Sequence, residues 1–230
     1  MSTLKGQGPT DDVAGPAAPE GGIEEELDDA DEGPENQGFL DFESLEPVSE
    51  APEEVRELAA ACVRFVTARY GVPIHFEPET LSLVDQYVTD SRAEVLVRPE
   101  AAEVLQAVIG AYLGEVMRRH FSGTWFCLGE HSGWRVNFRH VYLTTNPIGM
   151  VREALLREPQ EGWHAHLQTD PQDRAFLTER LAALPEVPED EYYAPTTRYD
   201  VVSIAHDALH GRMGATARGH LVFDDGDYKS

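Results

Sequence analysis

Cysteine and lysine are both scarce in this sequence of 230 residues. The two cysteines, Cys62 and Cys127, are too few for a disulfide framework or for a zinc site built from cysteine. The chain lacks any apolar run of about 18 residues, the length that predicts a transmembrane helix. Its first residues also lack the apolar segment of a secretory signal. These absences favour a cytoplasmic protein with reduced thiols and predict no membrane contact.

Positive charge is scarce as well. The chain has 18 Lys and Arg against 42 Asp and Glu, which gives a formal net charge of −24. Proteins bind the phosphates of nucleic acids through clustered Lys and Arg, so this charge predicts no nucleic-acid partner. The glycine-rich phosphate loops of nucleotide-binding folds and the nucleophile elbow of the α/β-hydrolases are also absent, and no cofactor is expected.

Much of the acidic charge lies near the N-terminus. Residues 1–54 contain 17 Asp and Glu, one Lys, and only nine Leu, Ile, Val and Phe. A segment with so little apolar surface and so much charge of one sign cannot offset the entropy lost on ordering. We therefore interpret residues 1–50 as a disordered acidic tail and residues 51–230 as a single domain.

One part of this tail differs from the rest because Phe39, Leu40 and Phe42 lie among its acidic residues. Acidic-hydrophobic segments of this kind can fold on a partner. The segment either binds a partner, docks on its own domain or has no binding role, and its sequence leaves these three alternatives open.

The domain has the patterns of an α+β fold, with helices packed on one small antiparallel sheet. Apolar residues recur at i, i+3, i+4 and i+7, and prolines stand at several helix starts. They predict helices over 52–70, 78–91, 99–121, 147–157, 171–184 and 198–213. Aromatic and β-branched residues predict strands over 124–128, 134–139, 141–145 and, at the end, 221–223.

The predicted helix 99–121 has a carboxylate on its apolar face. At about 100° per residue, Glu115 lies about 20° from Val104, inside the apolar arc, and Arg119 follows one turn later. Gly114 precedes Glu115 in the helix interior, where glycine costs about 1 kcal/mol relative to alanine. The two features indicate close packing and a bonding partner for Glu115.

Two roles for Glu115 follow from this position. A buried charge must be paired, and the available cations are Arg119 on the same helix and Arg135 or Arg139 on the predicted sheet. Alternatively, Glu115 is a ligand-binding or catalytic carboxylate with a raised pKa.

Three short motifs occur in order along residues 78–157. The run from Ala111 to Val116, Ala-Tyr-Leu-Gly-Glu-Val, lies near the end of a helix, Gly123-Thr124-Trp125 enters a strand, and Asn146-Pro147-Ile148 opens another helix. This order resembles a group of small uncharacterised bacterial domains with a Leu-Gly-Glu helix, a Trp-bearing strand and a Pro-led helix. The resemblance implies an α+β fold and, because that group is of unknown function, no particular activity.

The predicted strand 134–139 has a basic face. Arg135 and Arg139 alternate with Trp134 and Phe138, so the arginines and the aromatic residues lie on opposite sides of the strand. A carboxylate-rich peptide, an anionic small molecule or the chain's own acidic tail would suit such a face. The alternative is a solvated face balanced by local acids.

His206 and His210 have the i, i+4 spacing of zinc-binding helices, although Asp207 stands where the usual motif has Glu. On a helical wheel His206 lies at the edge of the apolar arc and His210 lies outside it. The pair is therefore expected at the helix surface and is a weak candidate for a metal site.

Two function classes remain. The first is a non-enzymatic cytosolic interaction protein of the inhibitor, immunity or adaptor type, with a regulatory acidic tail and a protein partner. Its candidate binding residues are Glu115, Arg119, Arg135, Arg139, Phe39, Leu40 and Phe42. The alternative is a hydrolase, metal-dependent or not, that uses His206 and His210 or Glu115.

Overall fold

The computed structural model describes residues 49–216 and 218–228. The predicted tail, residues 1–50, lies outside the described residues except for its last two. Phe39, Leu40 and Phe42 also lie outside them, so their binding role stays a prediction.

Seven α-helices lie in the described part of the chain, and most begin at or directly after a proline. Proline suits the first turn of a helix because its missing N–H would have no partner there. The helices are α1 (Glu53–Tyr70), α2 (Leu81–Val97), α3 (Pro99–His120), α4 (Pro147–Leu156), α5 (Pro171–Ala182), α6 (Glu189–Tyr192) and α7 (Pro195–Ala215).

In the same part of the chain, four short strands form one antiparallel sheet, in the order β1-β2-β3-β4. They are β1 (Gly123–Phe126), β2 (Arg135–Phe138), β3 (Leu143–Thr145) and β4 (Gln168–Thr169). The register pairs Trp125 with Val136 and Val136 with Thr145. The predicted α+β fold, with helices packed on one small antiparallel sheet, is confirmed.

Some predicted boundaries are wrong. Helix α2 extends six residues past its predicted end at residue 91, because Val95 is buried in the core and the helix stops only before Pro99. The predicted strand over 221–223 is not a strand, and it joins the sheet region by one backbone bond from Phe223 N to Arg139 O, 2.8 Å long. The two-residue β4 and four-residue α6 were not predicted, because such short elements show no periodicity.

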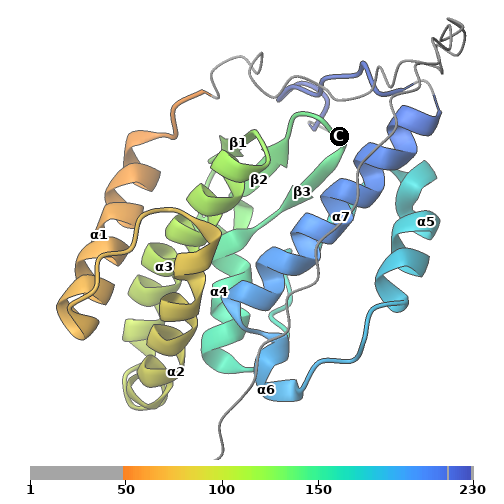
Figure 1. Cartoon of the computed structure of the whole chain (residues 1–230). Coiled ribbons are helices and arrows are strands. Elements are labelled where there is room, and N and C mark those ends of the chain that lie inside the picture. The colour runs from red at the N-terminus through yellow and green to blue at the C-terminus, as the bar shows by residue number, and fades with distance from the viewer. Residues whose placement is uncertain (1–48, 217, 229–230) are drawn as a thin grey trace, which may run out of the picture. The chain divides into compact units, whose positions relative to one another are not determined.

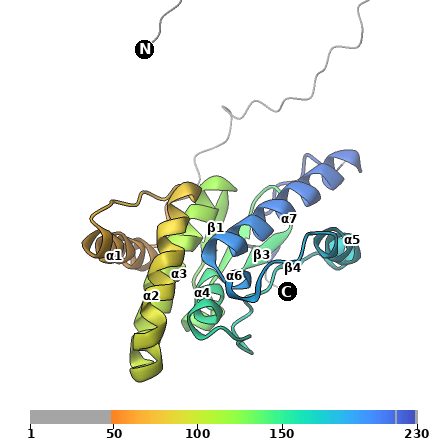
Figure 2. The same ribbon diagram turned by 60° about the horizontal axis from the view of Figure 1, so that its bottom comes forward.

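Helix α3 is the centre of the arrangement. It packs against α1, α2, α4 and α7 and against strands β1 and β2, and the views in Figures 1 and 2 show it surrounded by these elements, with α1 and α5 at opposite ends. At Gly110 an added Cβ would lie 2.5 Å from the Cα of Ile148, so only glycine lets α3 and α4 approach this closely.

The surroundings of α3 explain where the apolar-arc prediction fails. Residues 105–118 are all buried, on every side of the helix, while Val104, predicted to face the core, is 56% exposed. The wheel assumes one buried face along the whole helix. In α3 the first turn is largely exposed, whereas the later turns are covered by other elements on every side. Glu115 is buried because it lies in these later turns.

Candidate functional site

Glu115 is held in a buried network of hydrogen bonds and ion pairs. Its side chain is almost fully buried, and Arg118 pairs with both carboxylate oxygens, Nε to Oε1 at 2.7 Å and Nη2 to Oε2 at 3.0 Å. Arg119 Nε lies 3.3 Å from Oε2. The pairing with Arg119, four residues after Glu115, was among those predicted. The dominant partner, Arg118, three residues after Glu115, was missed.

Gly114 and Trp125 complete this network. A Cβ on Gly114 would lie 2.2 Å from Cζ2 of Trp125, so the glycine leaves room for the indole ring against α3. The indole nitrogen then donates a 2.9 Å hydrogen bond to Oε1 of Glu115. The predicted close packing at Gly114 is confirmed.

The electrostatics of Glu115 fit a structural role. Burial raises the pKa of its carboxyl, but hydrogen bonds and the positive charge of Arg118, with smaller effects of Trp125 and Arg119, outweigh burial and hold the pKa below its usual value. A catalytic acid was expected to have a raised pKa. Glu115 is therefore a charged anchor that joins α3 to the sheet.

Arg135, the first residue of β2, bonds to backbone oxygens and not to Glu115. Arg135 donates from Nη1 to the backbone oxygens of Ser132 and Trp134, at 2.9 and 2.7 Å, and burial lowers the pKa of its guanidinium. Between Arg135 and Arg139, Asn137 is buried and accepts a 2.7 Å hydrogen bond from Thr144 Oγ1. Partner binding by Arg135 and Arg139 stays a prediction.

Arg119 combines its contact to Glu115 with a second one. Its guanidinium carbon lies 4.0 Å from the centre of the Phe76 ring, a cation–π contact. About half of its side chain is exposed, so Arg119 closes the network toward solvent.

The structure corrects the expected surface position of His206. Its ring packs in an aromatic cluster, 5.0 Å from the ring of Phe121 and 6.1 Å from that of Phe138, and it stacks on His210 at 6.2 Å. Its Nε2 is buried with no hydrogen-bond partner in the described part of the chain. Within residues 49–216 and 218–228, no group of three or more His, Cys, Asp or Glu is placed to bind a metal ion.

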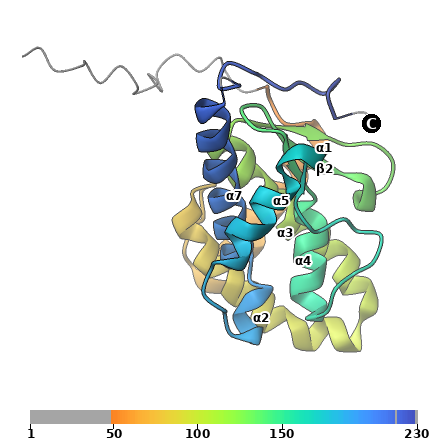
Figure 3. The ribbon, with the colours of Figure 1, turned by 90° about the vertical axis from the view of Figure 1, so that its right-hand side faces the viewer.

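A large groove lies on another side of the fold. This α5–α7 groove, of about 1140 Å³, lies between α5, the residues that follow it through α6, the N-terminal half of α7, and residues 165–169, which include β4. Figure 3 faces this side, with α5 toward the viewer beside α7. Its apolar lining includes Leu177, Leu181, Leu184, Val187, Val201 and Ile204.

One residue of the groove lining, Arg198, belongs to a buried ion pair. Nη2 of Arg198, on α7, lies 2.8 Å from Oε2 of Glu153, on α4, and both side chains are at most about one-tenth exposed. Tyr192 and Tyr193 lie under the same guanidinium, with ring centres 4.7 and 5.3 Å away. Nε of Arg198 is buried without a partner among the described residues.

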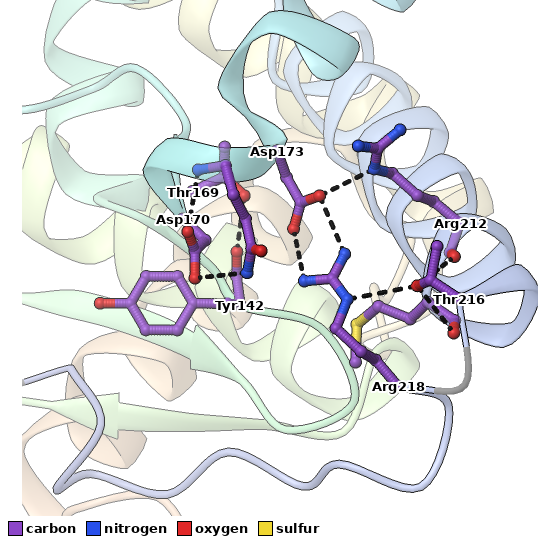
Figure 4. A network of polar contacts seen from close by, with 9 residues as sticks. Tyr142, Thr169, Asp170, Asp173, Arg212, Thr216 and Arg218 are labelled. Carbon is purple, nitrogen blue, oxygen red and sulfur yellow. Dashed lines mark hydrogen bonds and ion pairs between the residues drawn. The ribbon is translucent and has the colours of Figure 1, made fainter.

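A polar network fastens α5 to the far end of α7 (Figure 4). Asp173, in the first turn of α5, accepts from Nε of Arg212 at 2.8 Å and from two nitrogens of Arg218 at 3.0 and 3.1 Å. Burial raises the pKa of Asp173, but the two arginines outweigh it and the pKa lies below its usual value. The guanidinium of Arg212 also lies 4.7 Å from the Phe176 ring centre. The network fixes one end of the helix pair that forms the groove.

The sequence analysis missed the groove because part of the apolar arc of α7 packs in the core and part of it lines the groove. Val202, Ala205 and Leu209 face the core and are buried, whereas Val201 and Ile204 are only half-buried and line the groove. The arc is wider than one packing contact requires, and this width is the sequence feature that could have indicated the groove.

The chain matches no protein-family model, no curated protein and no solved structure. In the part that the structure describes, no helix is both long and apolar enough to cross a membrane.

Proposed function

We propose that this chain is a non-enzymatic cytosolic interaction protein, of the inhibitor, immunity or adaptor type, that binds a protein partner in the α5–α7 groove. In this proposal the acidic residues 1–50 regulate that binding.

The observation that supports the proposal is the apolar lining of the groove. Leu181, Leu184, Val201 and Ile204 are half-buried and Val187 is exposed, although all five surround one hollow. Removing such surface from water contributes about 25 cal/mol per Å², which the entropy lost on association offsets in part. The volume of about 1140 Å³ is larger than the roughly 300–1,000 Å³ of most small-molecule pockets. A segment of another protein therefore suits the groove better than a small ligand.

The proposal is tested by affinity capture with the full chain and two variants. Val201→Asp places a charge in the groove, while Val97→Asp makes the same change at a side chain that is 79% exposed at the end of α2. A protein that is captured by the parent and by Val97→Asp is then purified and titrated against all three. We expect one-to-one binding that Val201→Asp weakens by at least about tenfold, or about 1.4 kcal/mol.

Equal affinity of Val201→Asp and Val97→Asp for every captured protein would place binding outside the groove. The regulatory role of the tail is tested in the same titration, with a chain that lacks residues 1–48. An unchanged affinity and an unchanged association rate would remove that part of the proposal.

A further inference from the structure

The rim of the α5–α7 groove is acidic. Glu186, Glu191 and Asp200 line it with exposed side chains. None of the three forms an ion pair with another described residue. Arg174 is the one exposed arginine among the described lining residues. Three carboxylates against one guanidinium give the rim a net negative charge.

The buried charges in the lining do not change this balance. Arg198 is the only other arginine of the described lining, and its charge is neutralised by Glu153 at 2.8 Å. Because Glu153 is itself buried, the pair acts as a neutral unit. An anionic ligand would therefore find no uncompensated buried cation in the lining.

Asp200 is exposed to solvent in part and desolvated in part. Burial raises the pKa of its carboxyl, because a partly desolvated carboxylate without a cation is less stable in its charged form. A Lys or Arg brought to the rim would stabilise that charged form and would gain an ion pair.

We infer that the segment bound in the α5–α7 groove is a cationic amphipathic helix, an inference that rests on the proposed function. Helices that bind in grooves place apolar anchors at i, i+3 or i+4, and i+7. The stretch of α5 and its link from Leu177 to Leu184 would match about two turns of such a helix, on the order of 10 Å at 1.5 Å per residue. Lys and Arg beside the apolar stripe would face Glu186, Glu191 and Asp200.

The other occupants fit less well. A second copy of this chain would bring a net charge of −24 to a rim that is already acidic, and like charges repel. An extended segment would have to pair with β4, the last strand in the sheet order, but β4 has only the two residues Gln168 and Thr169. The acidic charge of the whole chain also steers cationic partners toward it.

Four labelled peptides of about 15 residues test the inference by fluorescence anisotropy with the full chain. The first has leucines at i, i+3, i+4 and i+7 and lysines elsewhere on the helix. The second has glutamates in place of the lysines. The third has the composition of the first in scrambled order, and the fourth has a central proline, which breaks the helix. We expect the first peptide to bind at least about tenfold more tightly than each of the others, and less tightly as salt rises.

Two charge variants locate the binding. The triple variant Glu186→Gln, Glu191→Gln, Asp200→Asn removes the rim charge with little change of size. The control triple Glu57→Gln, Glu100→Gln, Glu103→Gln removes as much charge from exposed positions on α1 and α3. We expect the rim triple variant to bind the first peptide about tenfold more weakly than the parent does. The control triple variant should bind it less than about twofold more weakly. Circular dichroism and thermal melting verify that both variants fold.

The outcomes separate the inference from the proposed function. If the glutamate peptide binds as tightly as the lysine peptide and Val201→Asp abolishes its binding, the cationic partner is overturned and the groove remains a binding site. If the scrambled or proline peptide binds equally well, the helix is overturned. The inference fails if the first peptide does not bind, or if it binds Val201→Asp and the rim triple variant as tightly as the parent. The proposed function is then still tested by the titration of the captured partner.

Discussion

The indole nitrogen of Trp125 donates a 2.9 Å hydrogen bond to Oε1 of Glu115, which joins β1 to the most buried part of α3. Gly114 provides the space in which the ring lies. The Leu-Gly-Glu and Trp motifs, which lie about ten residues apart in the sequence, are therefore the two sides of one contact.

This contact predicts that Glu115→Ala destabilises the fold strongly. The change leaves the buried guanidinium of Arg118 without its carboxylate and the indole N–H of Trp125 without its acceptor. Removing one member of a buried ion pair costs about 3–5 kcal/mol. Urea unfolding at neutral pH measures the loss.

Two further variants make this measurement specific. Glu57→Ala, at an exposed position of α1, is expected to change the free energy of unfolding by less than about 0.5 kcal/mol. Glu115→Gln keeps an acceptor for Trp125 but loses the charge, and we expect a loss between those of the two alanine variants. A Glu115→Ala protein as stable as the parent would show that the network adds nothing.

For Gly114→Ala, helix propensity and packing predict opposite changes in stability. Helix propensity alone predicts that this change stabilises the protein by about 1 kcal/mol. The structure predicts the opposite, because the new Cβ would lie 2.2 Å from Cζ2 of Trp125. Overpacking of this kind costs typically about 1–3 kcal/mol, so we expect a lower melting temperature and a weaker Glu115–Trp125 hydrogen bond.

Gly211→Ala is the matched control. Gly211 lies in α7, and beyond the neighbouring backbone of its own helix no atom lies within 4 Å of the position of an added Cβ. The same substitution is therefore expected to raise stability by up to about 1 kcal/mol. If Gly114→Ala and Gly211→Ala both shift the melting temperature in the same direction, the packing argument for Gly114 is contradicted.

The fold was largely predictable because the long elements have strong local patterns. The six long helices were predicted from apolar periodicity and from prolines, and α4 also from its cap Asn146, whose Oδ1 accepts from Gly149 N at 2.9 Å. Three of the four strands were predicted from aromatic and β-branched residues. The packing of Glu115 was predictable in kind, because Gly114 and Glu115 on an apolar face both indicate a close contact.

The groove was not predictable for a physical reason. Its walls come from α5, α7 and β4. The distance between two packed helices depends on tertiary contacts, and no local sequence pattern predicts it. Glu153 was missed in the same way. Its partner Arg198 lies 45 residues later, and no local pattern links an acid on one helix to a base on another.

The Asp173 network predicts how α5 is held. Asp173→Asn keeps the size of the side chain and removes the charge that Arg212 and Arg218 share. Hydrogen bonds to charged groups contribute about 1.5–3 kcal/mol, and we expect a loss of that order, with faster amide hydrogen exchange in α5. Asp170→Asn is the control, because asparagine caps a helix about as well as aspartate. Equal effects of the two changes would contradict the role of the network.

The largely buried ring of His206 predicts a loss of stability in mildly acidic solution. Burial lowers the pKa of His206 below the 6.5 of an ordinary histidine, although Asp207 acts in the opposite direction, and burial lowers the pKa of His140 too. Because the unfolded chain then takes up protons at a higher pH than the folded one, stability is fully present above about pH 7. It falls as the pH drops below about 6.5, by up to about 1.4 kcal/mol per pH unit for each histidine.

Thermal melting between pH 7.5 and 5.5 tests this prediction before most carboxylates titrate. His206→Phe keeps an aromatic ring beside Phe121 and Phe138 but takes up no proton, so we expect its melting temperature to fall less steeply with pH than that of the parent. His75→Phe, at an exposed position, should keep the parent's slope. Because the Asp207 contact would make protonation less costly, a parent whose melting temperature stays level from pH 7.5 to 5.5 would mean that this contact cancels burial at His206.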